Sequence, residues 1–164
     1  MNGMRSLNPA TDSQSRLSRK RSGSSVLEID SWMPSTIQAI SPLVERLMRL
    51  IEGSQCAPGE EFDVELALRE ALENAVVHGN QEDPDTKVHV RCRCQPGKEI
   101  SIVVTDEGKG FDFEKIVGNG ITSDPGSEHG RGIQLMKAYM DDVNFERHGS
   151  EVHMRKRSRP GFRS

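Results

Sequence analysis

Hydrophobic positions recur at helical spacing in the stretch from Glu65 to Gly79 and just before it. One stripe of this stretch is wholly apolar, as in a helix that packs on a core, and consists of Val64, Leu68, Ala71, Leu72, Ala75 and Val76. A second stripe holds Glu70 and Asn74, which are four residues apart and therefore share one helix face. The neighbours of this pair on the stripe are Ala67 and Val77, so we expect the face to border a covered pocket. A carboxylate can accept a proton and an amide oxygen can bind Mg²⁺, although an amphipathic helix with two ordinary polar residues remains the alternative.

Apolar residues alternate with polar ones in four further segments, and this alternation predicts strands. Two of these strands, at 88–94 and 100–104, are joined by a hairpin, and two more, at 141–145 and 150–154, form a second hairpin around Gly149. Asp106 continues the inward face of the strand at 100–104, where a buried acid is costly unless something specific pairs with it.

The N-terminal part of the domain is predicted to contain a short strand, Val26–Ile29, and then a helix with apolar positions from Ile37 to Ile51. Pro42 could lie in an early turn of that helix behind a Ser41 cap, which leaves its start open. Asp63 is a plausible N-cap of the helix that carries Glu70.

Seven glycines between Gly108 and Gly132 mark a long irregular segment, which we interpret as a functional lid. A third helix begins at Gly130-Arg-Gly-Ile133, where free backbone N–H groups would form a phosphate site. The order of elements predicts an α/β two-layer sandwich in which helices cover one face of a mostly antiparallel sheet.

Length and composition place the chain among small globular proteins. A chain of 164 residues fits one domain, and it has neither an apolar stretch that could cross a bilayer nor an apolar N-terminal signal, so we expect a cytoplasmic protein. Cys56, Cys92 and Cys94 suit reduced thiols better than a disulfide framework, and a metal site at the Cys-x-Cys pair is less favoured than core packing.

Charge is unevenly distributed along the sequence. Residues 1–25 and 155–164 carry five Lys or Arg each, whereas residues 26–154 contain 12 basic and 24 acidic residues. We expect disordered basic tails at 1–24 and 158–164 around a domain at 25–157. Because no recognition-helix pattern or interleaved aromatics accompany them, these basic residues favour solvation over direct nucleic-acid binding.

Four motifs follow one another in the sequence: Glu70-x-x-x-Asn74, Asp106-Glu-Gly-Lys-Gly-Phe111, Gly130-Arg-Gly-Ile-x-Leu-Met136 and Gly149-Ser-Glu-Val152. In this order and spacing, the set resembles the GHKL ATPases, whose Bergerat fold serves histidine kinases, gyrase and MutL. The resemblance runs from about residue 26 to 157. Within this family, the chain most resembles the stand-alone anti-sigma factor serine/threonine kinases of the RsbW and SpoIIAB type, in its compact size and in the run Glu70-Ala-x-x-Asn-Ala-x-x-His-Gly79.

The resemblance implies ATP and Mg²⁺ as cofactors and assigns roles to the motif residues. Glu70 would be the catalytic base or water-positioning residue, Asn74 the Mg²⁺ ligand, and Asp106 the acceptor of a hydrogen bond from the adenine amine. Arg131 could add charge to the phosphates or could equally face solvent. The other nucleotide-binding positions that the resemblance implies are Gly108, Gly110, Phe111, Gly130, Gly132, Ile133 and Ser150.

The resemblance also implies a function: an ATP- and Mg²⁺-dependent serine/threonine protein kinase that acts as an anti-sigma factor. Such a protein would phosphorylate a STAS-type antagonist, sequester a sigma factor and form a homodimer. One alternative is a non-catalytic, ATP-gated protein-binding switch, which needs the nucleotide contacts but not Glu70 as a base. Another is a relative of histidine kinases that phosphorylates His or Asp, which the absence of phosphoacceptor helices disfavours.

Overall fold

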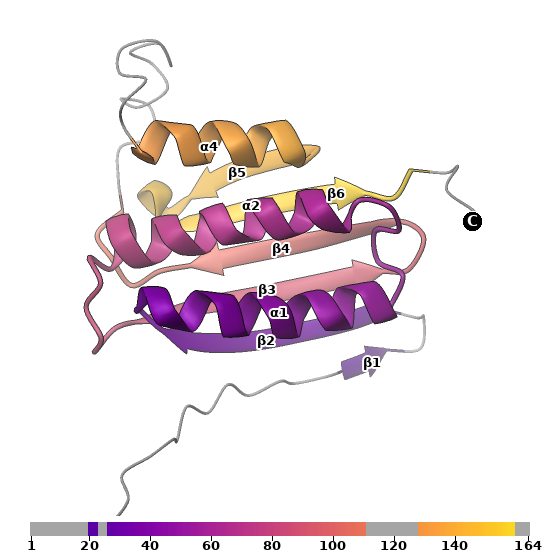
Figure 1. The fold of residues 1–164 in the computed structure, drawn as a ribbon, viewed down its shortest axis with the longest axis horizontal. Helices are drawn as coiled ribbons and strands as arrows, with labels where there is room; N and C mark the ends of the chain where they lie inside the picture. The colour runs from indigo at the N-terminus through magenta and orange to yellow at the C-terminus, as the bar shows by residue number, and fades with distance from the viewer. Residues whose placement is uncertain (1–19, 23–25, 111–127, 160–164) are drawn as a thin grey trace, which may run out of the picture.

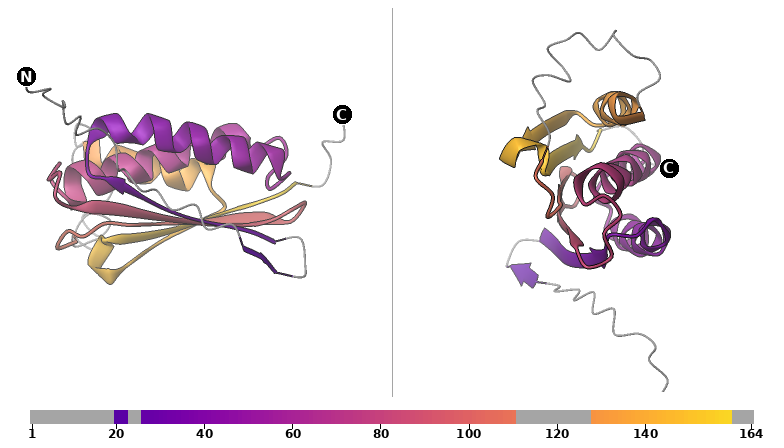
Figure 2. Two further views of the ribbon diagram at one scale, coloured as in Figure 1. Left: turned by 90° about the horizontal axis from the view of Figure 1, so that it is seen from below. Right: turned by 90° about the vertical axis from the view of Figure 1, so that its left-hand side faces the viewer.

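The computed structural model describes residues 20–22, 26–110 and 128–159. Within these residues, six strands form one sheet in the order β1-β2-β3-β4-β6-β5, with every pair antiparallel. The strands are β1 (Lys20–Ser22), β2 (Val26–Pro34), β3 (Lys87–Gln95), β4 (Glu99–Thr105), β5 (Asp142–Glu146) and β6 (Glu151–Arg157). The helices α1 (Ile37–Gly53), α2 (Glu61–Glu73) and α4 (Glu128–Tyr139) all lie on one face of the sheet (Figures 1 and 2). The predicted α/β two-layer sandwich is confirmed.

The hydrophobic core lies between the helices and the sheet. Alternate residues of β3 and β4 point into it, from Val88 to Cys94 and from Ile100 to Val104, because side chains alternate between the two faces of a strand. The apolar stripe predicted for α2 is buried along its whole length, at 0 to 6% exposure. The periodicity of the sequence therefore identified the core face of this helix correctly.

The helix that carries Glu70 and Asn74 changes its winding in the middle of the motif. α2 ends at Glu73 and continues as a π-helical turn, η1 (Asn74–Gly79), so the helical stretch ends at Gly79 as expected. π-helical turns inside α-helices are rare and concentrate at functional sites. The wider turn begins at Asn74, one of the two candidate functional residues of this helix.

Two predicted details of the first half of the chain are wrong, and one that the sequence left open is decided. The first helix starts at Ile37, so Pro42 lies inside α1. β2 runs to Pro34, well past Ile29, because it pairs with β3 from Leu27 to Pro34. α2 has Glu60 rather than Asp63 at its N-cap. Asp63 instead lies in the first turn of α2 and binds a lysine of β6, which local sequence could not indicate.

Parts of the expected basic tails belong to the sheet. β1 pairs with β2, so the prediction of disorder for 1–24 is wrong for Lys20–Ser22. At the other end, β6 includes Arg155 and Lys156, and Lys156 is only 2% exposed, so these residues are not solvating tail residues. Of the remaining predicted disorder, residues 1–19, 23–24 and 160–164 lie outside the described residues.

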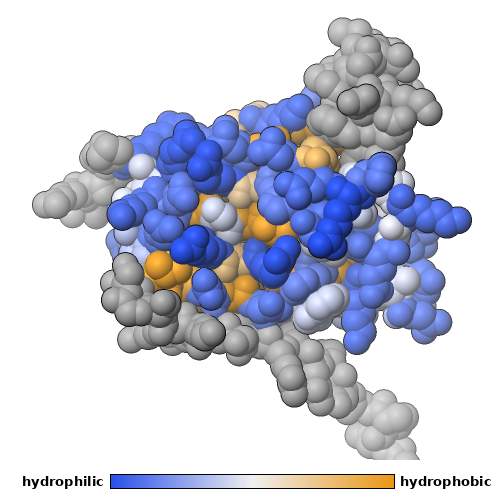
Figure 3. Space-filling model, turned by 180° about the vertical axis from the view of Figure 1, so that it is seen from behind, coloured by the Kyte–Doolittle hydropathy of each residue, from blue (hydrophilic) through white to orange (hydrophobic). Residues whose placement is uncertain are grey.

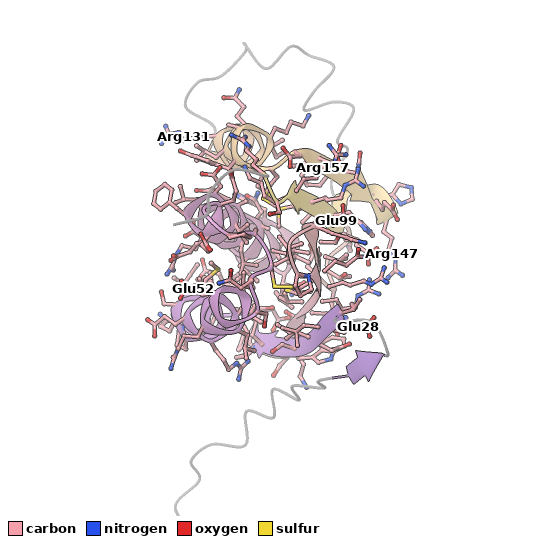
Figure 4. All side chains as sticks on the ribbon, turned by 90° about the vertical axis from the view of Figure 1, so that its right-hand side faces the viewer. Glu28, Glu52, Glu99, Arg131, Arg147 and Arg157 are labelled. Atoms are coloured by element: carbon pink, nitrogen blue, oxygen red, sulfur yellow. A yellow bond between two sulfur atoms is a disulfide. The ribbon has the colours of Figure 1, made fainter. Side chains whose placement is uncertain are left out.

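The cysteines also differ from expectation. Cys56, in the loop after α1, and Cys94, on β3, form a disulfide between the helix layer and the sheet (Figure 4). The prediction of reduced thiols is wrong for this pair, because the fold brings together two residues that are 38 positions apart. Cys92 is a free buried thiol, and burial raises its pKa to about 12.

No helix of the described residues covers the opposite face of the sheet, which is mainly hydrophilic with a hydrophobic area near its middle (Figure 3). Polar pairs cross this face, such as His89 Nε2 with Asp30 Oδ1 at 2.8 Å, and the Trp32 ring stacks on the His89 ring at 3.9 Å. Within the described part of the chain, no helix combines the length and apolar character needed to cross a membrane.

Candidate functional site

The candidate site lies where four elements end or begin at the same edge of the sandwich. The η1 turn, the C-terminal end of β4, the N-terminal end of α4 and the start of β6 all reach the left-hand edge in Figure 1. Two neighbouring pockets open at this edge, and Asn74 lines both of them. The motifs that are far apart in the sequence therefore meet in one place.

The first pocket is narrow and mostly apolar, with an open volume of about 310 Å³. Its lining residues are Ala71, Asn74, Ala75, Gly79, Val104, Asp106, Met136, Phe145, Gly149, Ser150 and Val152. Burial raises the pKa of Asp106 to about 6, although a hydrogen bond from the Gly108 N–H to its Oδ1, at 2.8 Å, acts in the opposite direction. The backbone N–H of Asp106 donates to the Ser150 carbonyl at 2.9 Å. A carboxylate at the edge of an apolar pocket is suited to accept a hydrogen bond from a flat, largely apolar ligand.

Glycines allow the backbone to close around Asp106. A Cβ at Gly79 would lie 2.4 Å from the Asp106 Cγ, and a Cβ at Gly108 would lie 2.0 Å from the Gly79 carbonyl oxygen. Gly110 has a φ of +75°, and a Cβ there would lie 2.1 Å from the His148 carbonyl oxygen. Because residues with side chains would clash at these positions, the turn after β4 can pack against η1 and the 3-10 turn Arg147–Gly149 after β5 only with glycine.

The second pocket is polar, with an open volume of about 650 Å³, and is lined by Glu70, Glu73, Asn74, Val77, His78, Arg131 and Gly132. Glu70 and Asn74 face α4 at Gly132, where an added Cβ would lie 2.9 Å from Glu70 Oε2 and 3.2 Å from Asn74 Nδ2. A pocket therefore adjoins this helix face, and α4 forms one of its walls.

The pKa of Glu70 is raised above its ordinary value. Burial is the largest cause, the neighbouring Glu73 carboxylate adds to it, and the Arg131 guanidinium opposes it. A carboxylate whose pKa is raised accepts a proton more readily near neutral pH, which suits a general base. Arg131 is exposed at α4, on the helix side of the molecule (Figure 4), and lines the same pocket as Glu70.

The predicted site residues fall into three groups. Glu70, Asn74, Asp106, Arg131, Gly132 and Ser150 line the two pockets, and Gly108 and Gly110 close the turn beside them. Ile133 is 3% exposed and packs in the core rather than lining either pocket. Phe111 and the lid at 111–127 lie outside the described residues.

The predicted phosphate site at the third helix stays a prediction. α4 is described from Glu128 onward, directly after residues outside the described part of the chain, so the described residues do not define its first turn. Arg131 and Gly132 of α4 line the polar pocket beside Glu70 and Asn74.

Two residues of the site region were missed as functional candidates. Gly79 was interpreted only as the helix end, but it borders the first pocket and contacts Asp106. Asn80 is 5% exposed, and its amide binds the turn that follows Asp106. A Gly-Asn pair at a helix end is so common that it gave no sequence signal beyond helix termination.

The residues present fit adenosine triphosphate with Mg²⁺. Apolar walls with one carboxylate and one serine suit adenine, which is flat and presents an amine donor, and the glycines leave room for close backbone approach. In the second pocket, the Asn74 and Glu70 oxygens are of the kind that hard cations prefer, and Arg131 brings positive charge for phosphate.

A two-layer α/β sandwich with an apolar pocket and an adjoining polar pocket defines a class of nucleotide-binding protein. The chain belongs to the histidine kinase-like ATPase domain family, whose sequence model matches residues 33–156.

Among individual proteins, the chain is 38% identical to an anti-sigma F factor of Heyndrickxia coagulans, over 47% of this chain and 54% of that protein. It is 33% identical to an anti-sigma F factor of Clostridium botulinum strain Eklund 17B, over 60% of this chain and 71% of that protein. It is also 35% identical to the serine-protein kinase RsbW of Bacillus subtilis, over 57% and 62% of the two lengths. The first match thus spans about half of the relative's length.

Proposed function

We propose that this protein is an ATP- and Mg²⁺-dependent serine/threonine protein kinase that acts as an anti-sigma factor. It phosphorylates a STAS-type antagonist and sequesters a sigma factor, as a cytoplasmic homodimer. The observation that carries the proposal is the position of Asn74 between two pockets, with Asp106 in the apolar pocket and Glu70 in the polar one. The names of the similar proteins, anti-sigma F factor and serine-protein kinase, support both halves of the proposal.

The residues divide the work between binding and proton transfer. Asp106 and Ser150 orient the adenine end, while Asn74 holds Mg²⁺, which when bound neutralises phosphate charge. Arg131 adds positive charge at the phosphate end. Glu70 accepts the proton of the substrate hydroxyl, and its raised pKa suits this role.

Single substitutions should separate these roles. We expect Asn74→Ala to abolish Mg·ATP binding measured by calorimetry. We expect Glu70→Gln, which keeps the size of the side chain, to retain binding and to lower phosphoryl transfer by about 10²- to 10⁴-fold. Equal ATP affinities for Asn74→Ala and the unmodified protein would contradict the nucleotide assignment.

The proposal as a whole is tested by capture of partners from the source cell in Mg·ATP, followed by γ-labelled ATP on the eluate. An acid-stable label on a small captured protein, present with the unmodified kinase and absent with Glu70→Gln, supports a serine/threonine kinase. An acid-labile label indicates His or Asp phosphorylation and contradicts it. Partners that bind in ATP but are never labelled would indicate the ATP-gated binding switch instead, and a captured sigma factor supports the anti-sigma role.

A further inference from the structure

Asn80 follows the η1 turn directly and has a buried side chain with three polar contacts. Its Nδ2 donates to the Ser35 Oγ at 2.6 Å and to the Lys87 carbonyl at 3.0 Å, and its Oδ1 accepts from the Glu107 backbone N–H at 2.8 Å. One amide thus joins the end of η1 to the residue after β2, the start of β3 and the turn after β4.

These contacts form a closed ring, because the Glu107 Oε2 in turn accepts the Lys87 backbone N–H at 2.7 Å. The ring fixes the orientation of the amide: a backbone N–H can only donate and a carbonyl can only accept, so Oδ1 must face Glu107 and Nδ2 must face Lys87. An aspartate at position 80 would set a carboxylate oxygen against the Lys87 carbonyl. The position therefore suits an amide specifically, and not any small polar side chain.

The ring acts on the residue next to Asp106. The backbone of Asp106 donates to the Ser150 carbonyl at 2.9 Å, and the next backbone N–H, that of Glu107, donates to Asn80. These two consecutive backbone N–H groups are therefore bound by different segments: that of Asp106 by Ser150, just before β6, and that of Glu107 by Asn80, just after η1. Asn80 itself lines neither pocket, so its influence on a ligand is indirect.

We propose that Asn80 is a positioning residue for adenine recognition: its amide holds the turn after β4 so that the Asp106 carboxylate faces the base. This inference rests on the proposed ATP-binding function and adds a residue that determines its base specificity. Without the amide, the Glu107 N–H loses its partner, and on this side the turn is held only by the bond between the Lys87 N–H and the Glu107 carboxylate. Asp106 then loses its alignment with the exocyclic amine, while the phosphate end, built from η1 and α4, keeps its contacts.

The test compares the full chain with its Asn80→Ala variant for two ligands measured by calorimetry with Mg²⁺. ATP carries the exocyclic amine, and purine riboside 5′-triphosphate is the same nucleotide without it. In the unmodified protein we expect ATP to bind at least about tenfold more tightly, the contribution of one hydrogen bond to a charged acceptor. In Asn80→Ala we expect this ratio to fall to about one to threefold, with the affinity for purine riboside triphosphate changed by less than about twofold.

Control variants separate positioning from loss of structure. Asn144→Ala, which removes an exposed Asn from β5, should keep the full ratio. If Asn80→Ala does not fold, Glu107→Ala opens the ring from its exposed side and should still lower the ratio at least about threefold.

Three outcomes overturn the inference. The first is a folded Asn80→Ala variant that keeps the ratio of the unmodified protein, and the second is one that loses affinity for both nucleotides equally, as general disruption would. The third is an unchanged ratio in Glu107→Ala when Asn80→Ala cannot be purified. Failure of the unmodified protein to bind ATP at all would overturn the proposed function together with this inference, so the two failures are distinguishable.

Discussion

The two ends of the layer formed by α2 and α4 differ in how far ion pairs compensate their buried charges. At the end away from the pockets, Lys156 is 2% exposed and its Nζ lies 2.8 Å from Asp63 Oδ2, 3.0 Å from Glu60 Oε2 and 2.6 Å from the Tyr139 carbonyl oxygen. Burial alone would lower the pKa of Lys156, but its bonds to Asp63 and Glu60 raise it. This cluster joins the N-terminal end of α2, the C-terminal end of α4 and the end of β6.

At the pocket end, the described residues give the carboxylates no comparable compensation. The pKa values of Glu70 and Asp106 are both raised, chiefly by burial, and Arg131 opposes the effect at Glu70 only partly. A paired cluster stabilises the fold, whereas carboxylates held in a pocket with raised pKa values reduce stability and are available to a ligand. The same two helices therefore carry a structural end and a candidate functional end.

The largest effect on stability should come from the Lys156 end. Lys156→Ala leaves two partly buried carboxylates without their lysine, and we expect the free energy of unfolding to fall by about 3 kcal/mol. Urea denaturation measures this change. Lys98→Ala, at an exposed position, should change the stability by less than about 0.5 kcal/mol. Equal losses for the two variants would contradict a structural role for the cluster, and so would a Lys156→Ala variant that loses ATP affinity without losing stability.

A methyl group added at the pocket end should lower activity rather than stability. In Gly132→Ala the new Cβ would meet the Glu70 carboxylate, which can rotate away, and alanine favours the helix by about 1 kcal/mol over glycine. We expect unchanged or higher stability, but about tenfold slower phosphoryl transfer because Glu70 is displaced. The control is Gln134→Ala, at an exposed position of α4. Full activity in Gly132→Ala would show that the position of Glu70 against α4 is not the active one.

The smallest expected effect is on the pH dependence of stability. The pKa of Asp106 is raised from 3.8 to about 6, so the folded state binds this proton more tightly than the unfolded state does. The stability contributed by this group is then highest below pH 3.8, falls as the pH rises to about 6, and stays low above that. Asp106→Asn should raise the free energy of unfolding at pH 7 by at most about 1 kcal/mol, since the side chain is only partly buried. Denaturation of Asp106→Asn and the unmodified protein at pH 4 and pH 7 tests this. An equal gain in the free energy of unfolding at both pH values would exclude the titration of Asp106 as its source.

The same carboxylate gives a matching prediction for binding. Protonated Asp106 no longer offers a charged acceptor to the adenine amine, so the preference for ATP over purine riboside triphosphate should decrease as the pH falls through about 6. The ratio of the two affinities cancels the titration of the phosphates, which the two ligands share. A ratio independent of pH between 5 and 7.5 would indicate that Asp106 does not contact the base.

Local patterns predicted the elements well where periodicity was long and failed where a distant partner decides the outcome. The core stripe of α2 and the alternation of β3 and β4 are confirmed. Burial of one face of a helix or strand requires apolar residues at the period of that element, and this period is visible in the sequence. The Cys56–Cys94 disulfide was not predicted, because it depends on the loop after α1 folding back onto β3. The core-facing Lys156 was counted with a basic tail for the same reason: its partners lie 93 residues earlier in the chain, at Asp63, and nearby at Glu60.

The sequence by itself determined the sandwich, the family resemblance and the residue types at the pockets, because hydrophobic period and motif spacing are properties of the chain alone. Only the tertiary structure decided which groups meet. It set Gly132 of α4 against Glu70 and Asn74, closed Gly79 and Gly108 around Asp106, and placed the Asn80 amide between η1, β3 and the turn after β4. Such contacts depend on how the helices and strands pack in three dimensions, and sequence spacing carries no information about that packing.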